Sequence, residues 1–270
     1  MERNPELIQD GEWETDDVQA PAVPVFLIHD GGGTTFTYHC LSPLNRPTYG
    51  ISNPQFHTGG RLEGGICGTA QLYADMIRRT CLERDFPAER NSDGSVNILI
   101  GGWSLGGILS LEIAKEMTGD RDVRIIGLLM VDTMYTVVPP TINLESLDKL
   151  EWGESENEQL VQQAMKEASL AITEWNPPIW TGKQAAQRPP MSLIRATDPI
   201  PAGSDRVQFV DVYRHTPSLG WYNHDVDMFT EIVDAKGDHF KIFSSENMPD
   251  ISRSIRQCLD TLEMLGPAAY

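Results

Sequence analysis

Apolar and polar positions along the chain form a repeating pattern in which short apolar runs alternate with longer, helix-spaced segments. The short runs predict strands, because continuous apolar sequence is typical of strands buried on both faces. They cover residues 23–28, 47–52, 96–100, 123–131, 191–195 and 230–233. Apolar residues at helical spacing predict helices over 69–82, 105–117, 161–175 and 249–265. This alternation favours an α/β domain with a mostly parallel sheet flanked by helices.

Two segments depart from that pattern. No strand is predicted within residues 133–190, where a short helix around 144–150 precedes the longer one. A long helical insertion at this point is typical of a lid over a substrate site. Residues 1–20 carry many charges and few apolar side chains, which predicts a flexible acidic leader or linker. We therefore expect one domain over residues 21–270.

The charge balance is strongly acidic, with 21 Lys and Arg against 39 Asp and Glu and a net charge of −18. Nucleic acids and anionic membrane surfaces repel such a chain, so neither is an expected partner. No apolar run is long enough for a membrane span, and the first residues lack the apolar core of a signal peptide. The four cysteines form no paired motif. We therefore expect reduced cysteines and a cytoplasmic protein.

The strongest chemical signal is the sequence GGWSLGG, in which Ser104 lies between a predicted strand and a predicted helix. The pattern G-x-S-x-G at such a turn is typical of a nucleophile elbow, which holds the hydroxyl at a strained apex. Gly102 and Gly106 are expected there because a Cβ at either position would crowd the neighbouring element. The helix N-terminus also favours the negative charge that develops in acyl transfer. We predict that Ser104 is a catalytic nucleophile.

Two further residues follow predicted strands in the order that α/β-hydrolases use, which is Ser, acid, His. His239 follows the last strand, and an imidazole is the base that a serine nucleophile needs. Asp132 directly follows the strand after the elbow helix, at the edge where open α/β sheets place their chemistry. Asp198 occupies the alternative position for the acid, but a Pro- and Gly-containing loop would hold it loosely. We predict a triad of Ser104, Asp132 and His239.

The first predicted strand ends in the sequence HDGGGT, whose glycines leave backbone N–H groups uncovered. A P-loop would require Lys and Ser or Thr, and a dinucleotide fingerprint requires a different glycine spacing. We interpret the segment as an oxyanion loop that pairs one of its N–H groups with that of Leu105. Neither metal-ligand spacing nor a nucleotide motif is present, so we expect no bound cofactor and no metal.

Taken together, FLIHDGGGT, GGWSLGG, the acid after LLMV and the final GDHF resemble a known family. They are similar to the thioesterase domains that end fungal polyketide synthases and nonribosomal peptide synthetases. The resemblance spans residues 23–265 and implies the α/β-hydrolase fold. It also implies an acyl substrate held as a thioester on the phosphopantetheine of an acyl or peptidyl carrier protein, in the same polypeptide or a separate one.

The same resemblance implies a role for each matching residue. Ser104 would be the acylated nucleophile, His239 its base and Asp132 the acid that orients the base. Gly31 and Leu105 would supply the oxyanion N–H groups.

Two alternatives have the same motifs. An oxygen-ester hydrolase would use the same three residues, and a catalytically silent hydrolase-fold protein would bind a ligand without reacting. The intact Ser, Asp and His argue against the silent protein. The sequence leaves open whether the acyl chain leaves by hydrolysis, cyclisation, transfer or condensation, and whether the domain is free-standing.

Overall fold

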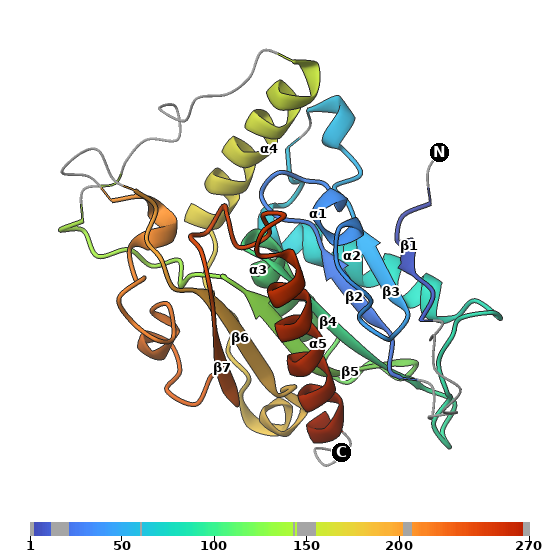
Figure 1. Cartoon of the computed structure of the whole chain (residues 1–270). Coiled ribbons are helices and arrows are strands. Elements are labelled where there is room, and N and C mark those ends of the chain that lie inside the picture. The colour runs from blue at the N-terminus through green and yellow to red at the C-terminus, as the bar shows by residue number, and fades with distance from the viewer. Residues whose placement is uncertain are drawn as a thin grey trace.

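The computed structural model describes residues 3–11, 22–59, 61–142, 144, 155–201 and 207–266. Within those residues, seven strands form one sheet in the order β1-β3-β2-β4-β5-β6-β7 (Figure 1). β1 pairs antiparallel to β3, and every other pair is parallel. The strands are β1 (Glu6–Gln9), β2 (Val25–Ile28), β3 (Thr48–Ile51), β4 (Val96–Trp103), β5 (Val123–Val131), β6 (Met191–Ala196) and β7 (Glu231–Ala235).

The described α-helices are α1 (Phe36–His39), α2 (Gly65–Cys81), α3 (Leu105–Glu116), α4 (Glu156–Thr173) and α5 (Met248–Leu265). Short 3-10 helices connect them: η1 (Phe56–Thr58), η3 (Gly182–Gln187), η4 (Phe209–Asp211) and η5 (Trp221–Asn223). This architecture confirms the predicted α/β-hydrolase fold class.

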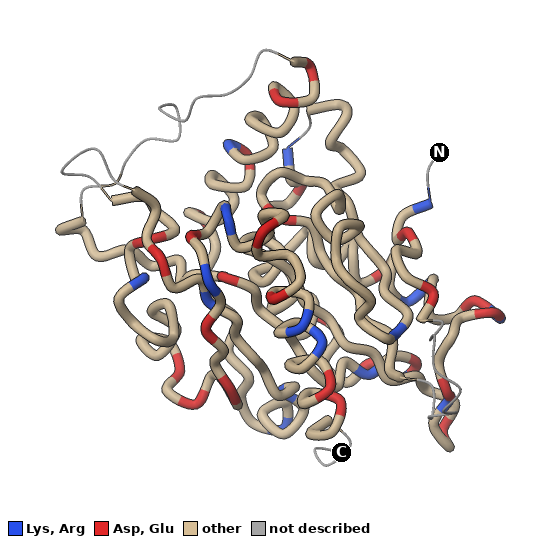
Figure 2. The backbone as a smooth tube through the Cα atoms, viewed as in Figure 1, with Lys and Arg blue, Asp and Glu red and all other residues tan. Residues whose placement is uncertain are grey.

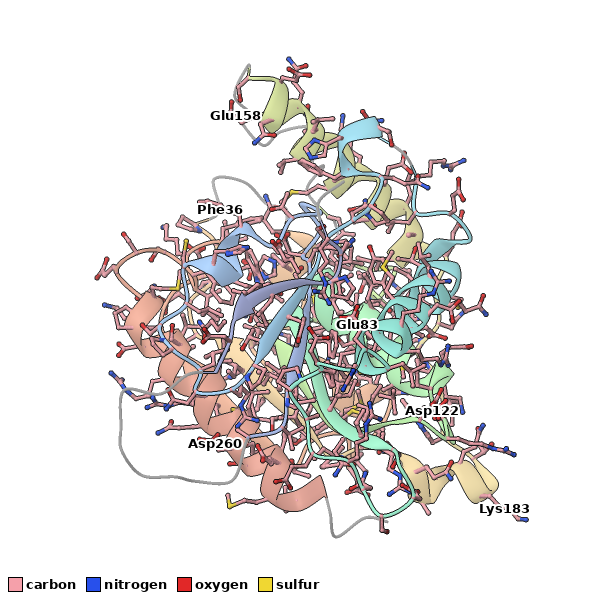
Figure 3. The ribbon with its side chains drawn as sticks, turned by 90° about the vertical axis from the view of Figure 1, so that its right-hand side faces the viewer. Phe36, Glu83, Asp122, Glu158, Lys183 and Asp260 are labelled. Atoms are coloured by element: carbon pink, nitrogen blue, oxygen red, sulfur yellow. The ribbon has the colours of Figure 1, made fainter. Side chains whose placement is uncertain are left out.

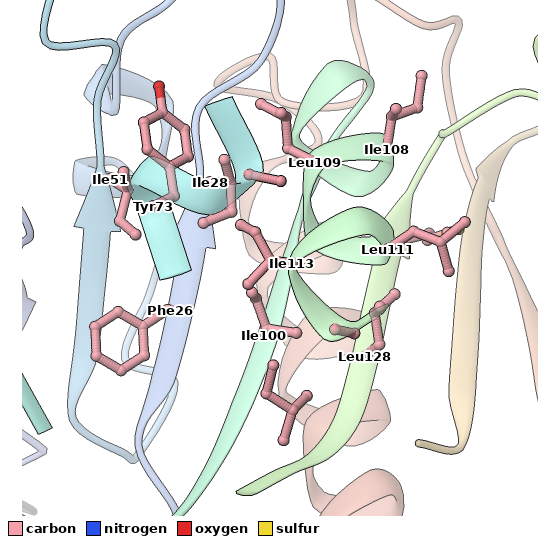
Figure 4. Packing of buried hydrophobic residues seen from close by; sticks show 14 of the residues in the cluster. Phe26, Ile28, Ile51, Tyr73, Ile100, Ile108, Leu109, Leu111, Ile113 and Leu128 are labelled. Atoms are coloured by element: carbon pink, nitrogen blue, oxygen red, sulfur yellow. The ribbon is translucent and has the colours of Figure 1, made fainter. Parts of the chain in front are cut away.

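Helices cover both faces of the sheet, with α2 and α3 on one face and α5 on the other (Figure 1). Neighbouring residues of a strand point to opposite faces. In β2, Phe26 and Ile28 therefore belong to the core under α2 and α3, while Val25 and Leu27 belong to the core under α5. Figure 4 shows the first core, where apolar side chains of β2, β4, α2 and α3 gather. Burial on both faces explains why the strands are continuous apolar runs in the sequence.

β4 is longer than predicted. The sequence suggests an end at residue 100, but the strand continues through Gly101 and Gly102 to Trp103. A Cβ at Gly101 would lie 2.6 Å from the carbonyl oxygen of Leu129 on β5. The glycine therefore allows close contact with β5 within the sheet rather than ending the strand.

Part of the expected leader is a strand. The sequence predicts flexible residues over 1–20, but Glu6–Gln9 form β1 at the edge of the sheet. Ile8 packs against the core under α5. β1 has only four residues, which is too few to give an apolar run in the sequence. Its pairing with β3, which is distant in the chain, holds it in the sheet instead. Residues 12–20 lie outside the described part of the chain.

The longer helix of the predicted lid is α4. It begins after Ser155, whose side chain accepts a hydrogen bond from Glu158 N–H in a capping box. In the view turned by 90°, Glu158 lies at the top of the molecule and Asp260 of α5 lies low in it (Figure 3). Of the predicted short helix around 144–150, only Leu144 is described, and it forms an isolated bridge with Val207.

Acidic residues are spread over helices, loops and strand ends rather than gathered in one segment (Figure 2). None of the helices in the described ranges has the length and apolarity needed to cross a membrane.

Candidate active site

Ser104 lies in the sharp turn between β4 and α3. Its φ of 55° and ψ of −115° form a backbone conformation that residues other than glycine rarely adopt. A Cβ at Gly102 would lie 2.7 Å from the backbone of Gly106, and one at Gly106 would lie 2.3 Å from the carbonyl oxygen of Ile28. These distances confirm that both glycines are required by close backbone contacts. The turn is the strand-to-helix elbow that the sequence predicts.

Asp132 directly follows β5, and His239 lies just after β7. The Nδ1 atom of His239 is 2.7 Å from Oδ2 of Asp132, and both side chains are buried. An ionised carboxylate only accepts hydrogen bonds, so Nδ1 donates, and in the neutral imidazole Nε2 is left as the acceptor. Ser104 and His239 line the same cavity. The fold therefore brings the three predicted residues together from the ends of three strands.

Asp198 is not part of this cluster. Its side chain is exposed, and its Oδ1 accepts a hydrogen bond from the Thr197 hydroxyl. Its N–H donates to the carbonyl of Gly237 at 3.0 Å. Of the two aspartates that the sequence offers, Asp132 is the one in contact with His239.

Arg214 also binds Asp132, a contact that no sequence pattern indicated. Its Nη2 donates to Oδ2 of Asp132 at 2.8 Å, while the Ala196 N–H donates to Oδ1 at 2.8 Å. Burial acts to raise the pKa of Asp132, but the hydrogen bonds from His239 and Arg214 outweigh burial and lower the pKa to about 2. Arg214 lies in a segment without strand or helix periodicity, and an Arg in such a segment is most often solvated.

Aromatic rings enclose His239. The ring centroid of Trp103 lies 5.4 Å from that of His239, and the Phe240 ring meets the imidazole edge-on at 5.2 Å. Trp103 packs in turn on Phe243 at 5.1 Å. The neighbouring Asp238 caps the turn by accepting hydrogen bonds from two backbone N–H groups, both at 3.1 Å. Packing and turn chemistry together fix the position of the imidazole.

The cavity beside Ser104 has a volume of about 780 Å³, including the part open to solvent. Its walls come from the loop after β2, the elbow, α4, the segment of η4 and the turn that carries His239. Gly31 and Leu105, the two expected oxyanion donors, both line it. Most of the lining is apolar, including Ile108, Met134, Met165, Ala168, Ile172 and Phe209. Such a lining suits an apolar chain attached to a reactive carbonyl.

Asp30 is an acidic group in the wall of this cavity that the sequence did not single out. Burial raises the pKa of its carboxyl to about 6, although the hydrogen bond from Gly32 N–H and the charge of His239 act to lower it. The signal was present in the HDGGGT loop, but a loop aspartate is usually a turn-forming residue. Asp30 does form such a turn, since its Oδ1 accepts from Gly32 N–H at 3.1 Å.

Comparison with known proteins supplies relatives, although no family model matches the chain. The chain is 31% identical to the probable thioesterase gloN of Glarea lozoyensis, over 98% of this chain and 99% of that protein. It is 27% identical to the nonribosomal peptide synthetase imqB of Aspergillus flavus, over 97% of this chain and 8% of the synthetase. The crystal structure of the NocB thioesterase domain, in covalent complex with a fluorophosphonate nocardicin G analogue, has the same fold. Its TM-score is 0.64 at 22% identity, with 89% of this chain and 95% of that chain covered.

The expected resemblance is thereby confirmed by relatives that match the chain over nearly its whole length. Together with the sheet order and the elbow, this shows that the chain belongs to the α/β-hydrolase thioesterases represented by these fungal proteins.

Proposed function

We propose that the protein is a serine thioesterase that releases a polyketide or peptidyl acyl chain from the phosphopantetheine thioester of a carrier protein. The contact that carries the proposal is the one between His239 Nδ1 and Asp132 Oδ2, at 2.7 Å, beside a cavity lined by Ser104. A serine, an oriented imidazole and an apolar cavity are the parts that acyl transfer requires.

In the proposed first half-reaction, the Ser104 hydroxyl oxygen attacks the thioester carbonyl and His239 Nε2 takes the hydroxyl proton. Asp132 keeps the imidazole in the tautomer that leaves Nε2 free to accept, and it stabilises the imidazolium that forms. The N–H groups of Gly31 and Leu105 donate to the oxygen of the tetrahedral intermediate. The carbon–sulfur bond then breaks and the arm leaves as a thiol with the proton from His239. A thiol with a pKa of about 8.5 needs less protonation by an acid to leave than an amine does.

In the second half-reaction, water or a nucleophile of the acyl chain attacks the acyl-enzyme. His239 takes a proton from that nucleophile and returns it to Ser104 as the ester bond breaks. Water gives hydrolysis, and an internal nucleophile gives a cyclic product. Neither route uses a bound cofactor.

The proposed partner is an acyl or peptidyl carrier protein, in the same polypeptide or a separate one. The match to a segment of imqB supports this partner, because there a related sequence is part of a nonribosomal peptide synthetase. The match to gloN along that protein's whole length supports a free-standing enzyme equally well. We propose that α4 acts as a lid wall, since Met165, Ala168 and Ile172 line the cavity.

The first test uses a serine-directed fluorophosphonate together with an acyl-pantetheine thioester and the matched oxygen ester. We expect one phosphonyl adduct on Ser104, release of thiol, and neither result with Ser104→Ala. Faster turnover of the oxygen ester would favour the ester hydrolase. A wild-type protein that gives neither adduct nor thiol would make the silent binding protein the better description.

The second test concerns the acid. Asp132→Asn should lower stability but leave the protein folded, because Arg214 keeps its ion pair with Asp211 at 2.9 Å. It should reduce acylation by up to about 10⁴-fold, because the wrong imidazole tautomer is then favoured. Asp198→Asn is the matched control, and we expect it to retain nearly full thioesterase activity. Stopped-flow acylation rates and melting temperatures of both variants decide the matter. An inactive but folded Asp198→Asn would assign the acid to the later loop.

A further inference from the structure

His29 and Tyr73 form a buried pair behind the loop that follows β2. His29 Nε2 lies 2.7 Å from the Tyr73 hydroxyl, and His29 Nδ1 lies 2.6 Å from the carbonyl oxygen of Asp30. The two residues are 1% and 0% exposed. Figure 4 shows Tyr73 beside Ile28, with its hydroxyl pointing toward the end of the sheet where β2 finishes. Neither residue has a role in the chemistry described above.

The direction of both hydrogen bonds follows from the groups involved. A carbonyl oxygen only accepts, so His29 Nδ1 carries a proton and donates to Asp30. Burial lowers the pKa of His29 to about 4, so the ring is neutral at pH 7 and Nε2 accepts. Burial also raises the pKa of Tyr73, whose hydroxyl therefore keeps its proton and donates. The chain of donors runs from Tyr73 to His29 to the carbonyl of Asp30.

That carbonyl belongs to the peptide bond whose nitrogen is Gly31. In a trans peptide the C=O and N–H point in opposite directions, so anchoring the carbonyl on His29 aims the Gly31 N–H away from His29. The N–H groups of Gly32 and Gly33 donate within the loop, to Oδ1 and the carbonyl of Asp30, each at 3.1 Å. The Gly31 N–H has no acceptor among the residues that the structure describes, and Gly31 lines the cavity with Ser104.

We propose that His29 and Tyr73 are positioning residues, which lock the peptide between Asp30 and Gly31 so that the Gly31 N–H faces the developing oxyanion. This inference rests on the proposed function, because it gives Gly31 the donor role. A peptide followed by three glycines rotates easily when nothing holds it, since no Cβ restricts the backbone. A donor that is already aimed costs no reorganisation during the reaction, and loss of one such donor typically lowers kcat by about 10²–10³-fold.

Three variants separate the steps of this chain. His29→Leu removes the side-chain donor to the Asp30 carbonyl and leaves, among the described residues, only the Gly33 N–H as a donor to it, at 3.1 Å. His29→Asn keeps it, because the Asn amide nitrogen lies close to the place of imidazole Nδ1. Tyr73→Phe removes the hydroxyl that selects the tautomer. Thr48→Val is the matched control: it also removes a buried hydrogen bond, from the hydroxyl to the Arg46 carbonyl at 3.1 Å, but at the opposite end of the sheet.

For each variant, we would measure kcat and KM with a short acyl thioester, the rate constant of fluorophosphonate inactivation, and the melting temperature. We expect His29→Leu to lower kcat and the inactivation rate together, by about 10–100-fold, with KM within about twofold. His29→Asn should recover most of the loss, and Tyr73→Phe should fall between them. Thr48→Val should lower the melting temperature and leave kcat unchanged. The imidazole ¹⁵N shifts of wild-type His29 should show the proton on Nδ1.

The proposal is overturned if folded His29→Leu keeps kcat and the inactivation rate within twofold of wild type. It is also overturned if His29→Asn fails as badly as His29→Leu, or if the proton resides on Nε2. If His29→Leu does not fold, the test is the comparison of kcat between Tyr73→Phe and the control Thr48→Val. Equal kcat values for these two variants would overturn the proposal. An inactive wild type that also resists the fluorophosphonate is a different result, because it rejects the proposed function itself.

Discussion

Arg214 and Asp132 form a charge pair in the protein interior, directly behind the imidazole of His239. Arg214 is 7% exposed and Asp132 is 1% exposed. Removing the guanidinium would leave a buried carboxylate with two hydrogen-bond donors, His239 and the Ala196 N–H. Loss of one partner of a buried pair is strongly destabilising, because the remaining charge stays away from water.

We therefore expect Arg214→Met to lower the free energy of unfolding by about 3–5 kcal/mol and to raise the pKa of Asp132. Arg195→Met is the matched control, since Arg195 pairs with Asp234, whose side chain is 57% exposed. Because the Asp234 carboxylate is largely in contact with water, this pair should contribute about 0–1 kcal/mol. Urea denaturation of both variants measures the difference. Similar losses of unfolding free energy in the two variants would show that the buried pair contributes no more to stability than the Arg195–Asp234 pair.

Asp30 gives a pH-dependent prediction. Its pKa is raised from 3.8 to about 6 in the folded protein, so folding favours the neutral carboxyl. The resulting stabilisation is complete below about pH 4 and is lost as the pH rises through 6. Asp30→Asn stays neutral and keeps an oxygen acceptor for Gly32 N–H. We expect its free energy of unfolding to exceed that of the wild type by about 3 kcal/mol at pH 7.5.

At pH 3 the Asp30→Asn variant and the wild type should be equally stable, because the Asp30 carboxyl is then neutral in both the folded and the unfolded state. Denaturation curves at the two pH values test the sign as well as the size. A variant that is equally stable at both values would mean that the carboxylate is well solvated. A gain at pH 7.5 would show that the wild type keeps a costly charge in its cavity wall.

The residues found from the sequence are those whose local context is distinctive. Ser104 has glycines on both sides at fixed spacing, and Asp132 follows an apolar run without a break. Arg214 and His29 have no such context, because their partners are distant in the chain or are backbone atoms. A pattern along the sequence contains no information about which carbonyl oxygen accepts the hydrogen bond of a buried imidazole.

Among the elements, α4 has two distinct sides. Met165, Ala168 and Ile172 recur at helical spacing and line the cavity, whereas Leu170 is 53% exposed. The Ala168 side chain is small, and it lies 3.8 Å from the position a Cβ would take on Gly31. The bulk at position 168 should therefore set how much of the cavity an acyl chain can fill.

We expect Ala168→Phe to reduce kcat/KM for a long acyl thioester at least tenfold more than for an acetyl thioester. Leu170→Phe places the same aromatic ring on the exposed side of α4 and should leave the ratio unchanged. Steady-state kinetics across a series of chain lengths provide the comparison. Equal losses of kcat/KM at all chain lengths would mean that α4 only packs against the core and does not select the acyl chain. In that case, replacing residues 159–175 by a short linker should also leave chain-length selectivity unchanged.

Helices and strands were predictable from the sequence where many consecutive residues follow the same apolar pattern. Strands buried on both faces contribute long apolar runs, and α5 has a regular apolar stripe. The wall formed around η4 was not predicted, because its 3-10 turns have neither helix nor strand periodicity. The edge strand β1 was missed for a different reason, since pairing with β3 stabilises it rather than its own composition.

At the scale of the whole molecule, β1 covers one edge of the sheet. Leu7 is 49% exposed and Ile8 packs against the core under α5, as the period of a strand requires. We expect Ile8→Ser to lower stability by about 1–2 kcal/mol and Leu7→Ser to have little effect. Thermal melts with light scattering test both, because loosening β1 uncovers the edge of β3. Equal effects would mean that β1 is not a structural strand.

The alternation of elements predicted the fold class, and the shared motifs predicted the family. The order of strands in the sheet was not available from the pattern, since each strand has nearly the same apolar character and the pairing depends on crossovers. That order is what places the ends of β4, β5 and β7 around one cavity. The candidate site therefore depends on topology as much as on its three side chains.

The contact between Trp103 and His239 places an intrinsic fluorophore in the site. The indole lines the cavity and lies 5.4 Å from the imidazole. Indole emission responds to the polarity around the ring and is quenched by a charged imidazole in contact with it. Arrival of an acyl chain and charging of His239 will therefore change the emission of one ring among six tryptophans. Subtracting the trace of Trp103→Phe isolates that ring, so each turnover is timed by fluorescence without an added dye.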